Sequence, residues 1–418
     1  MTSTPPAGRA PAGAAPRVAV VGVHGHGTWH VRHCAELHAA GRIRLVAVAD
    51  PQLATPGEPA ASAAPPSSPP APGAAGGGRV TRVEDLPAGT LVFADLESLL
   101  AATEVDVVVI STPIHTHVPL AELALRAGAD VLLEKPPAAS LEEFERLQRV
   151  VEETGRACQV GFQVHGSKAA RTMAEWVRDG RLGEIRGIGA VGTWIRNQEY
   201  WQRARWSGKR SLDGVAVVDG AVTNPFAHAS ATALLVDGSG TAGQVTTVET
   251  ELYRANPIEA DDTSTVRIST TRGTTIVAAL TLCAEPPGGD PQIIVHGSRG
   301  RAVLTYPTDH LELTVDGVTT SASYERDDLL LNLIEHREDP AVELLAPLEQ
   351  LGGFTKVLEA VRLSPPPREI DPALINWQGE GPERHPVVHD VNKWAGQAAE
   401  SLALFSELGA PWAAGNEG

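Results

Sequence analysis

The stretch from Asp106 to Pro136 constrains the fold most, because it sets two buried strands and an intervening helix in consecutive order. Val107–Ile110 is an uninterrupted β-branched run, which is typical of a parallel strand covered on both faces. His117–Ala127 carries leucines at helical spacing, and Val131–Leu133 is a second short buried run. This order predicts a Rossmann-type, doubly wound α/β sheet.

Three polar residues of this stretch stand where its strands end. Thr112 follows the first strand, His117 opens the helix, and Lys135 follows the second strand within Glu134-Lys135-Pro136. Ligands of open parallel sheets bind outside the carboxyl ends of the strands. We therefore expect Thr112, His117 and Lys135 to face one crevice, which is the candidate active site.

The combination of a buried strand, Thr112-Pro113, a histidine four residues after that proline, and the Glu-Lys-Pro triplet resembles the Gfo/Idh/MocA family of nicotinamide-dependent oxidoreductases. With the features below, the resemblance runs from Arg17 to about Ala413. It implies that Lys135 contacts the reacting hydroxyl, and that a homo-oligomer covers the sheet of the second domain. The cofactor-binding residues expected in this stretch are Thr112, Pro113, His117, Glu134 and Lys135.

A glycine-rich turn joins the first buried strand, Val18–Val21, to a predicted helix. Glycines at such a turn let the backbone approach a pyrophosphate, whose charge the helix N-terminus stabilises. Gly22 and Gly27 match the outer positions of G-x-G-x-x-G, while His24 takes the middle position with Gly25 beside it. We expect this turn to bind the cofactor through Gly22, His24, Gly25, His26 and Gly27.

The next strand, Ile43–Ala49, ends at Asp50, 23 residues after Gly27. An acidic residue at that place accepts the ribose hydroxyls of NAD and repels the 2′-phosphate of NADP. No arginine or lysine follows until Arg79, so the sequence favours NAD over NADP.

Four histidines, His24, His26, His30 and His33, lie close together in the sequence, which is a feature of some zinc sites. Two of them lie in a loop whose shape the cofactor would dictate, and Cys34 is adjacent to His33 and so points another way on a helix. We expect no metal here. His30 also matches a position where the resembled family often has histidine.

The length of 418 residues predicts two or three units. Residues 16–160 are the expected NAD-binding domain, preceded by a disordered tail at 1–15 and interrupted at 51–78 by a disordered segment of Pro, Ala, Ser and Gly. Residues 161–413 are expected to form an α+β domain for substrate binding and oligomerisation, ending in a helix at 388–408.

The second domain owes this prediction to one helix at Ala169–Asp179 followed by many short β-rich runs, which predict a large, mostly antiparallel open sheet. These runs are Ile185–Trp194, Gln244–Tyr253, Ser264–Thr270, Thr275–Leu282, Ile293–Val295, Ala302–Thr305 and Leu311–Val315.

The net charge of −17 argues against a nucleic-acid or membrane-surface partner, because both need a basic face. The three cysteines are widely separated, which favours reduced thiols. The first residues lack the apolar core of a signal peptide, and no apolar stretch approaches the roughly 20 residues that span a bilayer. We expect a soluble, cytoplasmic protein.

His228 is the candidate base, because an imidazole works near neutral pH with little tuning. Members of the resembled family have an Asp and a His separated by three residues at this place, and here Asn224 stands at the Asp position. An amide can bind a substrate or orient His228, but it cannot accept a proton. Asp219 is a possible substitute, and the expected catalytic residues are Lys135, His228 and Asn224.

The segment from Trp194 to Arg210 combines aromatic and basic residues, which suit a sugar face and an anionic group, or equally a packed surface loop. His165 stands in place of a polar-basic pair and is either a substrate contact or a loop histidine. The expected substrate-binding residues are His165, Trp194, Arg196, Tyr200, Trp201, Asn224 and His228.

These features predict an NAD-dependent oxidoreductase that transfers a hydride between nicotinamide and a secondary alcohol or ketone of a sugar, polyol or related compound. Two alternatives stay open. The first is an NAD-using glycoside hydrolase of the same fold, and the second is a non-catalytic, cofactor-sensing regulatory protein.

Overall fold

The computed structural model describes residues 14–54 and 81–414, which form two compact units. The first unit runs from the N-terminal part to residue 138 and also holds 142–161 and 329–348. The second unit comprises 139–141, 162–328 and the residues after 348. The fold class predicted from the sequence, a Rossmann-type sheet plus an α+β domain, is confirmed.

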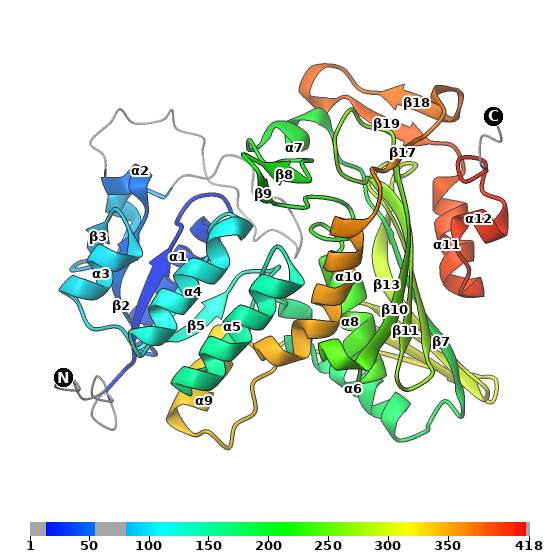
Figure 1. The fold of residues 1–418 in the computed structure, drawn as a ribbon. Helices are drawn as coiled ribbons and strands as arrows, with labels where there is room; N and C mark the ends of the chain where they lie inside the picture. The colour runs from blue at the N-terminus through cyan, green and yellow to red at the C-terminus, as the bar shows by residue number, and fades with distance from the viewer. Residues whose placement is uncertain (1–13, 55–80, 415–418) are drawn as a thin grey trace. The chain divides into compact units, whose positions relative to one another are not determined.

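The first unit is built on a six-stranded parallel sheet in the order β3-β2-β1-β4-β5-β6 (Figure 1). Every residue of β4 and β5 is buried, as continuous apolar runs predict for strands covered on both faces. The strand order reverses between β1 and β4, and ligands bind at such a reversal in open α/β sheets. The strands are β1 (Arg17–Val21), β2 (Arg44–Ala49), β3 (Leu91–Phe93), β4 (Val107–Ile110), β5 (Asp130–Leu133) and β6 (Cys158–Val160).

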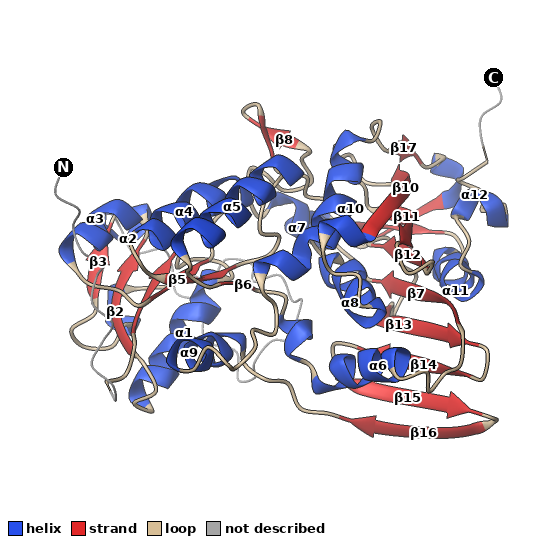
Figure 2. Ribbon diagram, turned by 60° about the horizontal axis from the view of Figure 1, so that its bottom comes forward, coloured by secondary structure: helices blue, strands red, loops and turns tan. Residues whose placement is uncertain are grey.

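Helices cover both faces of this sheet. Figure 2 shows α3, α4 and α5 on one face and α1 and α9 on the other. The amphipathic pattern of α5 buries Phe144, Leu147 and Val150. The helices of this unit are α1 (Gly27–Ala39), α2 (Pro51–Ala54), α3 (Leu96–Ala102), α4 (His117–Arg126), α5 (Leu141–Thr154) and α9 (Leu329–Glu338).

Helix α9 lies far along the chain, in a part that the sequence assigned to the second domain. Its Arg337 donates from Nη1 to Asp130 at 2.6 Å and from Nη2 to Asp106 at 3.0 Å. Both carboxylates are buried in the first unit and need a cation. The Nε2 atom of Gln159 also donates a hydrogen bond to the carbonyl oxygen of Leu329 at 2.5 Å. The boundary at residue 161 therefore does not hold for 329–348.

The second unit is built on a nine-stranded sheet in the order β16-β15-β14-β13-β7-β12-β11-β10-β17. Its neighbouring strands pair antiparallel except β7 with β12 and β10 with β17. The strands are β7 (Ile185–Thr193), β10 (Val245–Arg254), β11 (Thr263–Thr270), β12 (Thr275–Thr281), β13 (Gly289–Gly297), β14 (Gly300–Thr305), β15 (His310–Val315), β16 (Val318–Ser323) and β17 (Arg368–Glu369).

Helices α6, α8 and α10 lie on one side of this sheet and α11 and α12 on the other (Figure 2). Two glycines of β7 admit this packing: an added Cβ would lie 2.2 Å from the carbonyl oxygen of Ala399 at Gly189, and 2.3 Å from the ring of Phe226 at Gly192. The helices are α6 (Lys168–Arg178), α7 (Gln198–Gln202), α8 (Ala227–Asp237), α10 (Gly352–Leu363), α11 (Val391–Ser401) and α12 (Phe405–Leu408).

Two hairpins and several 3₁₀ turns complete the described chain. The hairpins pair β8 (Ser211–Leu212) with β9 (Val215–Ala216) and β18 (Ile375–Gln378) with β19 (His385–Val388). The turns are η1 (Val83–Asp85), η2 (Ile114–Thr116), η3 (Gln163–Gly166), η4 (Ala242–Gln244), η5 (Leu348–Leu351), η6 (Pro372–Leu374) and η7 (Gly381–Glu383).

The single C-terminal helix predicted at 388–408 is wrong. Val388 belongs to β19, and α11 ends at Ser401 because Leu402 adopts a left-handed conformation with φ of 55°. The break turns the chain so that Phe405, at the start of α12, packs its ring 5.3 Å from that of Trp412. Burial of this aromatic pair stabilises two short helices in place of one long one.

The predicted disordered segments fall largely outside the described residues. Residues 1–13 of the tail and all of the insertion from residue 55 onward lie there, whereas Pro51–Ala54 forms α2. Within the described chain the three cysteines are buried and carry free thiols. None of the helices in that part of the chain is both long and apolar enough to cross a membrane.

Candidate functional site

The turn between β1 and α1 accepts only glycine at its two outer positions. Gly22 has a φ of +79°, and a Cβ there would lie 2.3 Å from the carbonyl oxygen of Ser111. A Cβ at Gly27 would lie 2.0 Å from the carbonyl oxygen of Gly22. Gly25, with a φ of +58°, meets nothing within 4 Å. The backbone is therefore drawn tightly against the end of β4, as a pyrophosphate-binding turn requires.

Asp50 follows β2 and lies beside this turn. Its Oδ2 accepts a hydrogen bond from the backbone nitrogen of Val23 at 3.1 Å, and its Oδ1 accepts one from Gln52 at 2.9 Å. His24, in the middle position of the glycine pattern, approaches Asp50 at 3.8 Å, and its Nδ1 accepts from the backbone of Thr81 at 3.4 Å. The acidic group thus lies where the sequence placed it, next to the cofactor turn.

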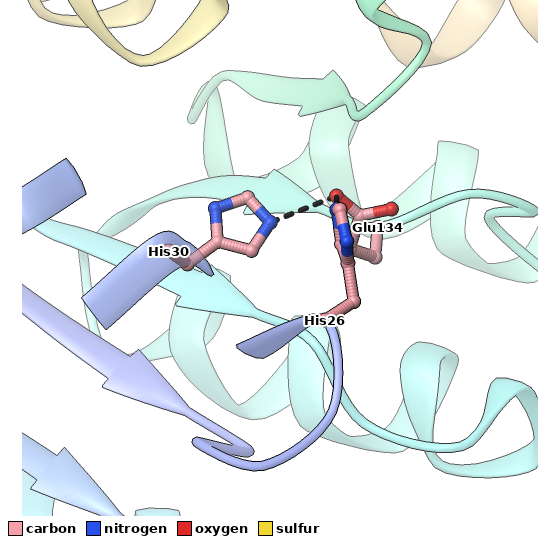
Figure 3. Close-up of side chains that lie close together, drawn as sticks. All are labelled: His26, His30 and Glu134. Atoms are coloured by element: carbon pink, nitrogen blue, oxygen red, sulfur yellow. Dashed lines mark hydrogen bonds and ion pairs between the residues drawn. The ribbon is translucent and has the colours of Figure 1, made fainter. Parts of the chain in front are cut away.

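Glu134, at the end of β5, meets His26 just before α1 and His30 within α1 (Figure 3). Its Oε1 lies 2.8 Å from Nε2 of His30 and 3.3 Å from Nε2 of His26. Burial opposes ionisation of Glu134, but the two imidazoles hold its pKa well below the usual value. Glu134 in turn raises the pKa of His26, whereas burial lowers the pKa of His30. The sequence predicted a cofactor contact for Glu134 and did not predict this cluster.

His117 does not share the setting of the other two residues expected at the crevice. Its ring nitrogens each lie 2.8 Å from a carbonyl oxygen, one of Thr112 and one of Pro136, and the side chain is 2% exposed. Burial lowers the pKa of His117, and the two carbonyl oxygens oppose this shift. The ring lies between the segments that follow β4 and β5. Thr112 and Lys135 are half-buried at those strand ends, and Pro113 is exposed.

In the second unit, Asn224 and His228 stand four residues apart where the chain enters α8. Both side chains are half-buried, and the ring of His228 meets Phe162 edge-on at 5.3 Å. Asn224 donates from Nδ2 to Oδ1 of Asp219. The chain that enters α8 therefore sets the amide of Asn224 against the carboxylate of Asp219 and the ring of His228 against Phe162.

Asp219 is 2% exposed and its acceptor capacity is heavily used. Besides Asn224, it accepts from Nη2 of Arg203 at 3.0 Å and from the backbone nitrogen of Gly208 at 2.8 Å. The ion pair with Arg203 and the two further hydrogen bonds fix the position of this carboxylate. Asp219 thus orients the amide of Asn224. The sequence suggested Asp219 only as a possible substitute for the missing acid at position 224, and it gave no sign of the ion pair with Arg203.

The aromatic and basic segment after β7 is tightly packed. Arg196 lies over the rings of Trp194 and Tyr200, 4.7 Å and 5.0 Å from their centroids. Burial lowers the pKa of Arg196 and raises that of Tyr200 to about 12. Trp201 is 7% exposed and packs edge-on against Tyr200, so it is a core residue.

The other basic side chains of this segment have partners within the protein, which favours the packed-loop interpretation over an anion-binding loop. Arg203 pairs with Asp219, Arg205 with Asp213, Lys209 with Glu259, and Arg210 donates to carbonyl oxygens of Val361, Arg362 and Ser364 at the end of α10.

His165, in η3, is 2% exposed, with its ring centroid 5.7 Å from that of Phe162. Burial lowers its pKa to about 4. This position suits a packed, neutral histidine better than a substrate contact.

Two family models match the chain, in order and without overlap. Residues 16–162 match an oxidoreductase family with an NAD-binding Rossmann fold. Residues 170–303 match the GFO/IDH/MocA C-terminal domain.

Similar curated proteins are named as dehydrogenases, reductases or oxidoreductases. A 1-carboxy-3-chloro-3,4-dihydroxycyclohexa-1,5-diene dehydrogenase of Comamonas testosteroni is 38% identical over 25% of this chain and 26% of its own. A levoglucosan dehydrogenase of Pseudarthrobacter phenanthrenivorans is 24% identical over 64% of this chain and 72% of its own. The match to the first seven such relatives spans 26–30% of their length.

Among solved structures, the WlbA dehydrogenase of Bordetella pertussis, crystallised with NADH and UDP-GlcNAcA, has the same fold. Its TM-score is 0.63 at 20% identity, over 83% of this chain and 94% of that one.

Proposed function

Because this chain belongs to the Gfo/Idh/MocA family of oxidoreductases, we propose that it transfers a hydride between nicotinamide and a secondary alcohol or ketone. One observation carries the proposal. Lys135 follows β5 at the carboxyl ends of the parallel strands, and the turn after β1 at the same end of the sheet admits only glycine at Gly22 and Gly27. A cationic side chain beside a dinucleotide turn is suited to a developing alkoxide.

The residues of the first unit fit NAD. The tight turn at Gly22 and Gly27 leaves room for a pyrophosphate, and the carboxylate of Asp50 suits the two ribose hydroxyls. When bound, NAD would supply the two-electron acceptor for the alcohol. Asp50 would repel a 2′-phosphate, so we propose NAD rather than NADP as the cofactor.

Three side chains are proposed to act on the substrate. The ammonium of Lys135 orients the hydroxyl and stabilises negative charge on its oxygen. The imidazole of His228 takes the hydroxyl proton. Asn224 presents its carbonyl oxygen to the substrate, because Asp219 already receives a hydrogen of its amide.

The proposed substrate is a sugar, a polyol or a related compound. Support comes from relatives named for a dihydroxylated ring and for levoglucosan, and from a structural neighbour crystallised with UDP-GlcNAcA. We also propose a homo-oligomer formed through the large sheet of the second unit, because every residue of its edge strand β16 is exposed and an unpaired edge is stabilised when it is covered.

The test is a screen at 340 nm of the purified protein with NAD or NADP against sugars, polyols, uronates and cyclitols. Lys135→Met should lower turnover by about 10²-fold or more while the affinity for NAD stays within a few fold. Lys393→Met, at an exposed lysine of α11, is the matched control and should leave both unchanged. Equal turnover of the two variants would contradict the role of Lys135.

The same screen separates the alternatives. Bound NAD with cleavage of a glycoside and no net absorbance change would indicate a hydrolase that uses NAD transiently. Bound NAD with neither reaction would indicate a cofactor-sensing protein. Tighter binding of NADP than of NAD would contradict the role given to Asp50.

A further inference from the structure

His26, His30 and Glu134 form a cluster of two imidazoles and one carboxylate, which are all groups that bind metal ions. One ligand atom from each of the three lies within 4.8 Å of the other two. Both imidazoles present Nε2 to a single carboxylate oxygen, at 3.3 Å and 2.8 Å. Figure 3 shows the rings of His26, which precedes α1, and His30, within α1, beside the carboxylate of Glu134.

One of these separations matches a tetrahedral transition-metal site, whereas the 2.8 Å between His30 and Glu134 is a hydrogen-bond distance that widens when an ion enters. Bonds of about 2.0 to 2.1 Å place two ligands of tetrahedral zinc roughly 3.3 Å apart. The gap between His26 and Glu134 already has this value. His26 is exposed, with 52% of its side-chain surface accessible, so its ring can turn toward His30.

The chemistry of the three groups also suits zinc. Two imidazoles and one carboxylate form the protein ligand set of several zinc enzymes, with a fourth position left for water. Each imidazole binds a metal through Nε2 when its ring proton is on Nδ1. The exposed side of His26 provides the path by which an ion enters from solvent.

We propose that His26, His30 and Glu134 form a zinc-binding site, in which water completes a tetrahedral shell. The site lies wholly within the first unit and does not depend on the proposed reaction. The sequence analysis considered four nearby histidines, among them His26 and His30, with Cys34 as a further possible ligand, and it predicted no metal site. It left out Glu134, which is 104 residues from His30 and reaches the cluster only through the end of β5.

Zinc binding is measured by isothermal titration calorimetry of the full chain with zinc chloride, in a buffer that does not chelate. The wild-type protein should take up one equivalent saturably. His26→Ala and His30→Ala should each weaken binding by about tenfold or more, because each removes a ligand. His389→Ala, at an exposed histidine of the second unit, is the matched control and should bind as the wild type does.

A spectroscopic readout separates this site from general histidine binding. The ring of Trp29 lies 5.9 Å from that of His26 and 4.9 Å from that of His30. Cobalt, as a paramagnetic substitute, should therefore quench the fluorescence of Trp29, and Trp29→Phe should remove that part of the response.

His26→Ala changes an exposed side chain, so the variant should keep the wild-type melting temperature, and a thermal scan verifies this. Absence of saturable zinc uptake by the wild-type protein would overturn the proposal. Equal affinities of His26→Ala, His30→Ala and His389→Ala would overturn it as well.

Discussion

At the scale of single residues, the side chains around Asn224 form a relay of fixed hydrogen bonds. Arg203 holds Asp219, and Asp219 accepts the amide hydrogen of Asn224. The hydrogen bond from its Nδ2 to Asp219 thereby orients the amide of Asn224. Asn224 stands where members of the resembled family have an Asp, and the carboxylate that contacts it, Asp219, is buried and five residues earlier in the chain.

Asn224→Asp would set two carboxylates side by side. Their repulsion raises the pKa of one of them in the folded protein. A raised folded pKa means that stability is present at low pH and is lost as pH rises from about 4 through the raised pKa, by about 1.4 kcal/mol per pKa unit. Urea unfolding at pH 4.5 and pH 7.5 measures this loss. Asn376→Asp, at an exposed position, is the control, and an equal loss in both variants would contradict the coupling.

His165→Leu should make the protein less sensitive to acid. The pKa of His165 is about 4 in the folded protein, against 6.5 for an ordinary histidine, because the ring is buried. The unfolded chain takes up this proton first, so stability is full above pH 6.5 and falls by up to about 3 kcal/mol toward pH 4.

Chemical unfolding across that pH window checks the expectation for His165. The stability of the leucine variant should fall less steeply than that of the wild type. His389→Ala, which removes an exposed histidine, should follow the wild-type curve. Parallel curves for the wild type and the leucine variant would mean that His165 does not set the acid sensitivity.

At the scale of elements, the contacts of α9 show how a helix is fixed to a sheet by charge. Arg337 bridges Asp106 and Asp130, which stand at the starts of β4 and β5. Arg17, at the start of β1, donates to Asp106 as well, with its Nε at 2.9 Å from Oδ2. The amino ends of three neighbouring strands are thus neutralised at one edge, opposite the edge that carries the candidate site.

Arg337→Met should destabilise the first unit by about 3 kcal/mol, because it leaves buried carboxylates without their full complement of cations. The comparison is Arg299→Met, which removes an exposed ion pair with Asp316 and should cost less than about 1 kcal/mol. Thermal and urea unfolding of both variants give the two values. Similar values would show that Arg337 contributes no more than a surface pair.

Local patterns predicted the elements whose signals are local. The bounds of β4 agree with the predicted strand Val107–Ile110, because this is a compact apolar run with polar residues at both ends. Strand β13 extends from Gly289 to Gly297, well beyond the apolar core Ile293–Val295, since pairing with β7 and β14 carries it further. The helix predicted at 388–408 failed because one left-handed residue outweighs an apolar stripe.

The candidate site divides in the same way. The glycine turn and Asp50 could be predicted from the sequence, because a tight turn after a strand depends on residues that are close together in the chain. The contacts of Glu134 with His30 and of Asp219 with Arg203 could not, since each depends on how distant segments meet. The sequence placed His117 at the start of a helix. It could not show that both ring nitrogens lie against backbone carbonyl oxygens, because residue spacing carries no information on such contacts.

At the scale of the whole molecule, neither unit is a continuous stretch of chain. Residues 329–348 complete the first unit after the chain has formed every strand of the second unit's large sheet except β17. Gln159 accepts from the backbone of Ala346 at 3.0 Å and donates to Leu329, so β6 depends on this late segment.

A fragment of residues 14–161 should therefore fail to fold cooperatively. Without α9 it lacks the cation that Asp130 pairs with and the backbone partners of Gln159. The same fragment joined by a flexible linker to residues 329–348 should recover a cooperative thermal transition. Circular dichroism melts of the two fragments check this, and identical cooperative melts would show that α9 is dispensable.

The late return of residues 329–348 bears on inheritance as well as on folding. A recombination event that cut the gene once, after the codon for Gly161, would bring in a relative's second unit together with a helix selected against another sheet. Its cation would then face Asp106 and Asp130 only by chance. We expect such exchanges to be disfavoured because they would destabilise the first unit. Changes in the second unit are therefore expected to arise by point substitution.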